Sequence, residues 1–152
     1  MIESAVNAVK QKKKVADKLS ISWAEIPDLA ILESKQIEKI LNKVLVQLPA
    51  LATIAVVEVA TGTCLAHLNR TRGFDPVVAA AYSAEIVRQK QQAMVALNMR
   101  GERLEDILIP FRKQLHLIRI ARNTQWFVYL VVKAQDTSLA LAREVLKSIV
   151  AW

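Results

Sequence analysis

Side chains that commonly do chemistry are scarce in this chain. Cys64 is its one thiol, and His67 and His116 are its two imidazoles. Cys64 and His67 lie three residues apart in an expected strand, so alternation predicts that they point to opposite faces and form no thiolate–imidazole pair. A zinc site needs three or four ligands at workable spacing, which this set does not supply. We therefore predict a buried thiol and two structural histidines, with no catalytic group, metal or cofactor.

Two further groups have the residue types of functional sites. Glu102, Glu105 and Asp106 resemble paired carboxylates, but they follow a long helical pattern and are interpreted as a solvated loop. Trp126 and Tyr129 would stack on nucleic-acid bases, but they should point to opposite faces of one strand, which favours core packing.

Cationic residues suggest contacts with partners. Arg70 and Arg72 lie in an expected loop, where an arginine finger toward a GTPase is weaker as a hypothesis than a solvated loop or an acidic-partner contact. The densest cluster is KQKKKVADK, residues 10–18, interpreted as a solvated helix face with an acidic partner or membrane as the alternative. Its contact residues would be Lys10, Lys12, Lys13, Lys14 and Lys18. The net charge of +7 is spread along the chain, which does not favour a specific nucleic-acid binder.

The composition is unusually apolar. Of 152 residues, 53% are hydrophobic, and the mean hydropathy is +0.25. The longest unbroken apolar run, residues 126–132, is far shorter than the roughly 18 residues of a membrane span. We therefore expect the surplus apolar surface to be buried against another copy of the chain. The lone cysteine and the absence of a signal-peptide pattern predict a cytoplasmic protein.

Hydrophobic periodicity predicts the order of elements. Helices are expected at residues 34–48, 75–99 and from 136–138 onward, with strands at 51–59, 63–68, 105–111, 114–122 and 126–133. Ser34 and Asp75 are expected N-caps, and one of Asp136, Thr137 and Ser138 is expected to cap the last helix. Gly62 is an expected turn residue and Gly101 an expected helix C-terminus. Strands 51–59 and 126–133 are apolar on both faces and should be central, whereas Pro110 places 105–111 at an edge.

The 75–99 helix is apolar over a wider arc than one sheet requires. A polar wedge of Glu85, Arg88 and Gln92 is surrounded by alanines and larger apolar residues. The width predicts contact with both the sheet and a partner chain. The outward candidates are Ala79, Tyr82, Ile86, Ala93 and Leu97.

Three stretches resemble the roadblock family, small domains first known as dynein light chains and GTPase-associated proteins. They are IAVVEVATGTCLAHL, LEDILIPFRKQLHLIRIA and WFVYLVVKAQDTSLALAREVLKSI. The resemblance implies an α/β sandwich of order α-β-β-α-β-β-β-α, with a five-stranded antiparallel sheet, one long helix on one face and two on the other. It covers residues 34–152; residues 1–33, a basic helical arm and connector, have no counterpart in the minimal domain. The family turn D-x-x-G is here E-V-A-T-G, which leaves the turn type open.

The resemblance also implies a homodimer that pairs through the long helix and the third strand. It adds Ile107 and Ile109 to the interface residues. The leading functional hypothesis is a non-enzymatic adaptor that binds a small Ras-like GTPase in bacterial signalling. The alternatives are a membrane-associated scaffold that uses the basic N-terminal helix and a small-ligand sensor.

Overall fold

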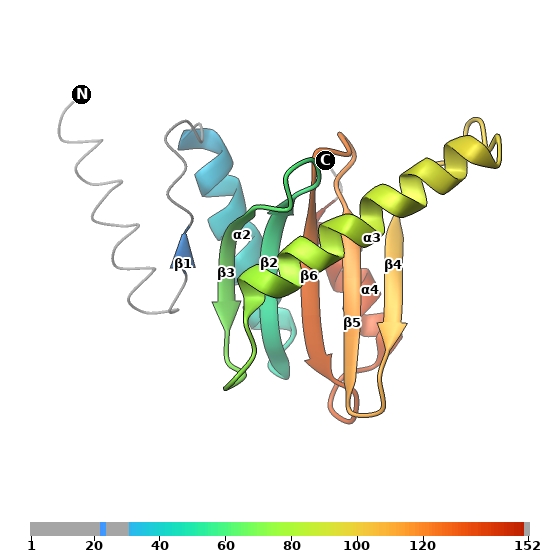
Figure 1. Ribbon diagram of the computed structural model, residues 1–152. Helices are drawn as coiled ribbons and strands as arrows, with labels where there is room; N and C mark the ends of the chain where they lie inside the picture. Colours follow the sequence, from blue (N-terminus) through green and yellow to red (C-terminus); the bar gives the residue numbers. More distant parts are fainter. Residues whose placement is uncertain (1–21, 24–30, 151–152) are drawn as a thin grey trace.

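The computed structural model describes residues 22–23 and 31–150 as one α+β layer structure (Figure 1). The predicted order α-β-β-α-β-β-β-α is confirmed. The elements are α2 (Ile31–Gln47), β2 (Leu51–Glu58), β3 (Cys64–Asn69), α3 (Pro76–Ala96), β4 (Asp106–Pro110), β5 (Gln114–Ile120), β6 (Trp126–Lys133) and α4 (Leu139–Ile149). The expected helical arm, including the lysines of residues 10–18, lies outside the described residues.

The five expected strands form one antiparallel sheet in the order β3-β2-β6-β5-β4. The two strands predicted to be central, β2 and β6, are neighbours in the middle of it. The Pro110 strand β4 lies at an edge, as predicted. A two-residue strand, β1 (Ser22–Trp23), adds to the other edge beside β3, which the sequence did not indicate.

Each face of the sheet carries its own apolar cluster. On one face, α2 and α4 cover side chains that include Ile54, Val56 and Leu130. On the other, α3 alone covers side chains that include Val57 and Phe127. Because residues of β2 and β6 alternate between these two layers, both central strands are apolar throughout. Full burial of one large apolar side chain stabilises the folded state by about 1.5–3 kcal/mol. Strands β2 and β6, which contribute such side chains to both layers, therefore form the main core.

Helix α3 begins as predicted but ends earlier. The Asp75 carboxylate accepts hydrogen bonds from the amides of Val77 and Val78, at 2.9 and 3.3 Å, and Pro76 occupies the first turn. The helix was expected to reach residue 99 with Gly101 at its C-terminus. It stops at Ala96 because Asn98 adopts a positive φ of 54°, a conformation that asparagine tolerates better than most residues.

The caps of the other helices differ in how well they were predicted. Helix α2 begins at Ile31, so Ser34 lies inside the helix and is not its N-cap. For α4, one of the three expected capping residues, Ser138, accepts a hydrogen bond from the amide of Leu141 at 3.1 Å. Serine is favoured at N-caps but also occurs inside helices, so its presence alone does not fix the first residue of a helix.

The β2–β3 turn is fastened to α3. Gly62 has φ 73°, and a Cβ atom there would lie 3.4 Å from Ala81 Cα and from Ala84 Cβ. The Arg88 guanidinium, expected in a polar wedge, donates to the carbonyl of Val59 at 2.6 Å. Helix and turn therefore hold each other in position.

Replacing Gly62 with valine should destabilise the protein more than the same change at Gly73. Both glycines have positive φ, at 73° and 79°, so each replacement should cost about 1–2 kcal/mol in backbone strain. Only at Gly62 would the added methyl groups meet α3, because Gly73 has open space around it. Urea unfolding of the two variants measures the difference, and equal losses would show that the turn does not pack against the helix.

Candidate functional site

Helix α3 leaves much of its apolar surface uncovered. Only Pro76, Ala80, Ser83, Ala84 and Val87 are buried among its 21 residues. Tyr82 is 67% exposed, Val95 82% and Leu97, just after the helix, 71%. Large apolar residues exposed along one helix often mark an interaction site.

The outward residues that the sequence singled out lie along one flank of α3. At 100° per residue, Ala79, Tyr82, Ile86, Ala93 and Leu97 fall on the side away from Arg88, which faces the β2–β3 turn. Ala79 is half-buried against the core of that sheet face, whereas Tyr82 and Ile86 are exposed. The flank is therefore accessible at Tyr82, Ile86 and Leu97, with the polar Gln89 and Lys90 between Ile86 and Ala93.

The two strand residues of the prediction lie on the same face of the sheet as α3. Ile107 pairs with Ile118, and Ile109 with His116, on the edge strand β4. Both isoleucines are half-buried, and among the described strands none lies beyond β4. We call the five helix-flank residues together with Ile107 and Ile109 the α3–β4 surface.

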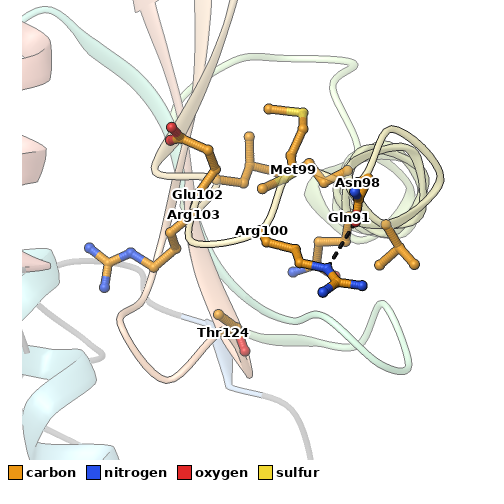
Figure 2. Close-up of a pocket in the computed structure, with 10 residues that line it drawn as sticks. Gln91, Asn98, Met99, Arg100, Glu102, Arg103 and Thr124 are labelled. Atoms are coloured by element: carbon orange, nitrogen blue, oxygen red, sulfur yellow. Dashed lines mark hydrogen bonds between the residues drawn. The ribbon is translucent and has the colours of Figure 1, made fainter.

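A hollow of about 460 Å³ adjoins the free end of α3 (Figure 2). Apolar side chains such as Met94, Met99 and Leu104 line it together with polar ones, and Arg100 Nε donates to Asn98 Oδ1 at 2.9 Å. None of the ten lining residues is buried. Small-molecule sites enclose most of the ligand surface, so this open hollow does not favour the ligand-sensor hypothesis.

The prediction that Cys64 and His67 point to opposite faces is wrong. A β-bulge interrupts the pairing of β2 with β3 between Val56 and Val57, so the alternation shifts by one residue. Cys64 then pairs with Val57 and His67 with Ala55, both on the α3 face, and Sγ lies 3.7 Å from His67 Nδ1.

This pair lacks the protonation states of a catalytic dyad. Burial, helped by the negative charge of Asp75, raises the pKa of the Cys64 thiol to about 11. Burial also lowers the pKa of His67, and Asp75 only partly opposes that change. At neutral pH the thiol is protonated and the imidazole neutral, which is unsuitable for nucleophilic attack.

His116 makes polar contacts with two side chains and is surrounded by aromatic rings. Its Nδ1 is 2.8 Å from the Tyr129 hydroxyl and its Nε2 is 3.0 Å from Gln114 Oε1. The rings of Phe111 and Phe74 lie 4.6 and 6.5 Å away. Burial lowers the pKa of His116 and raises that of Tyr129 to about 12, so both groups are neutral near pH 7.

The acidic group predicted to be a solvated loop is partly structural. Asp106 begins β4 and lies 3.4 Å from Arg119 and 3.2 Å from Arg143, which joins the edge strand to α4. Glu105 lies 3.8 Å from the same Arg119. Glu102 is an exposed loop residue that forms no ion pair within the described part of the chain. The sequence carried no signal for these pairs, because their partners are 13 or more residues away.

The remaining candidates form no recognised site in the described part of the chain. Arg70 and Arg72 are exposed. Trp126 and Tyr129 lie against opposite core layers, as expected. Residues 22–23 and 31–150 contain no group of three side chains suited to a metal ion. The helices in the same ranges include none with the length and apolarity needed to cross a bilayer.

The buried histidines should make the protein less stable in mild acid. Because the pKa values of His67 and His116 are lowered in the folded state, the unfolded chain takes up protons first as the pH falls through about 6.5. The free energy of unfolding should therefore decrease between about pH 7.5 and 5.5. Urea unfolding should show a smaller decrease in the His67→Gln/His116→Gln variant, and an equal decrease would contradict this assignment.

Comparisons with known proteins agree on the fold. No family model and no curated protein matches the sequence. Among solved structures, Myxococcus xanthus MglB superposes with a TM-score of 0.70 at 14% identity, over 82% of this chain and 89% of that one. A structure described as MglB with tetrameric arrangement gives 0.65 at 14% identity, covering 85% and 92%. A Roadblock/LC7 domain from Streptomyces avermitilis gives 0.55 at 12%, covering 72% and 88%. This chain therefore has a roadblock-like fold.

Proposed function

We propose that the protein is a non-enzymatic, homodimeric adaptor of the cytoplasm that binds and regulates a small Ras-like GTPase. The observation that carries the proposal is the α3–β4 surface, an uncovered apolar stripe beside a free strand edge. The roadblock-like fold supports it, because the resemblance in sequence is to a family that includes GTPase-associated proteins.

A second copy of the chain fits this surface on physical grounds. Pairing of β4 with its counterpart would satisfy the backbone groups of an open edge, which otherwise favours uncontrolled association. Ile107 and Ile109 would then become covered, and so would Tyr82 and Ile86. Pro110 lacks an amide hydrogen and would limit how far the two strands pair.

The GTPase would be bound by surface contacts, with no catalytic group supplied. The neutral states of Cys64, His67 and His116 support a regulatory rather than chemical role. The outward parts of α3 not covered by the second copy would bind one conformation of the GTPase switch regions more tightly. Differential affinity of this kind shifts the populations of the two conformations.

Light scattering should give a mass near 34 kDa for the purified protein, twice the 17.0 kDa of one chain. Tyr82→Asp and Ile86→Asp place a charge in the apolar interface and should give folded monomers. Tyr82 is 67% exposed, so its replacement should not disturb the monomer core.

Val46→Asp is the matched control. Val46 is 82% exposed on α2, on the opposite side of the sheet, and its replacement should leave the dimer intact. A wild-type monomer at micromolar concentration, or an unchanged dimer in both α3 variants, would contradict the assigned interface.

The protein should be used as bait in affinity capture from native cytoplasmic extract, to which either a GTP analogue or GDP has been added. We expect it to recover one Ras-like GTPase, with more recovered in one nucleotide state than in the other. Val46→Asp should recover it equally well, whereas Tyr82→Asp should recover at least about tenfold less, equivalent to 1.4 kcal/mol. Repeated capture without any GTPase would count against the adaptor function while leaving the dimer untouched.

A further inference from the structure

Cationic side chains collect at one end of the sheet. Antiparallel pairing brings the end of β3, the end of β6 and the β4–β5 turn to the same end of the sheet, at the bottom of Figure 1. Gln114 pairs with Lys133, and the amide of Arg70 donates to Ala52 near the start of β2. The exposed cations there, which we call the basic edge, are Arg70, Arg72, Arg112, Lys113 and Lys133.

Within the described residues, no cation of the basic edge forms an ion pair. The ion pairs found there involve Arg103, Arg119 and Arg143 with Glu105 and Asp106, at the opposite end of the sheet. The described acids nearest the basic edge in sequence are Asp75, which caps α3, and the exposed Asp136. Among the described residues, cations therefore outnumber acids at this edge.

An exposed aromatic ring lies within this charged edge. Phe111 follows the exposed Pro110 and precedes Arg112 and Lys113, and its side chain is 55% exposed. His116 supports the ring from one side at 4.6 Å. Phenylalanine on an apolar side combined with lysine and arginine on a polar side is a composition found in segments that lie at the membrane surface.

We propose that the basic edge, with Phe111 at its tip, docks the protein on a membrane surface that carries anionic lipid. A row of cations along a sheet edge matches a planar negative surface, and clusters of about four to eight lysines and arginines suffice for such binding. The phenylalanine ring adds apolar contact at the headgroup level. None of the five cations belongs to the α3–β4 surface, and Phe111 adjoins that surface two residues after Ile109. The proposal does not depend on GTPase binding.

Co-sedimentation of the full chain with vesicles tests the proposal. Wild type should bind vesicles of phosphatidylcholine with phosphatidylserine, and not vesicles of phosphatidylcholine alone. Binding should weaken severalfold between about 0.1 and 0.5 M salt, because screening shortens electrostatic reach. The variant Arg112→Gln/Lys113→Gln/Lys133→Gln should lose at least about fivefold in the bound fraction, and Phe111→Ser about twofold.

The matched control is Lys35→Gln/Lys39→Gln/Lys43→Gln, which removes the same charge from exposed positions on α2. It should bind nearly as wild type does. Binding of the edge variant at the wild-type level, or equal losses in both triple variants, would overturn the proposal. Binding to poly-glutamate or poly-uridine without binding to anionic vesicles would also overturn it, in favour of an acidic macromolecular partner.

Discussion

The fold depends on two adjacent strands that must be kept from water on both faces. The seven residues 51–57 of β2 and the six residues 127–132 of β6 are all buried, and the two strands pair along their length. Neither strand has a polar face that would tolerate solvent. The chain therefore has to place helices on both sides of the sheet, and every other contact is arranged around that requirement.

The two sides are covered unequally, and this inequality produces the candidate interaction surface. Helices α2 and α4 share one face, whereas α3 crosses the other alone and diagonally, with its C-terminal end reaching past β4 (Figure 1). A helix on a sheet touches it along one stripe, so most of α3 remains outside the core. Because its outward residues include Tyr82 and Val95 rather than only charged side chains, the helix is suited to bind a second surface.

The two ends of the sheet differ in charge. Asp106 and Glu105 join Arg119 and Arg143 at one end of the sheet, where opposite charges are paired. At the other end the described turns and strand ends carry five exposed arginines and lysines, with Asp75 and Asp136 as the nearest acids in sequence. The same protein thus has an apolar flank on α3 and a cationic end of the sheet, and the two meet near Ile109 and Phe111.

Local features of the sequence were enough to predict the order of elements, the central strands, the edge position of the Pro110 strand and the Asp75 cap. Each of these depends on periodicity or on side chains within one turn of the backbone. Tyr82 and Ile86, which the same periodicity predicted to face outward from α3, are exposed. The sequence did not predict three other features, which are the residue range of α2, the early end of α3 at Asn98 and the β-bulge opposite Val56. Each of them depends on tertiary packing as well as on the conformational preference of the local sequence. Only the tertiary structure brought Cys64 beside His67, linked Asp106 to Arg143 and gathered the five cations at one edge, since these depend on strand register and on contacts between segments far apart in the chain.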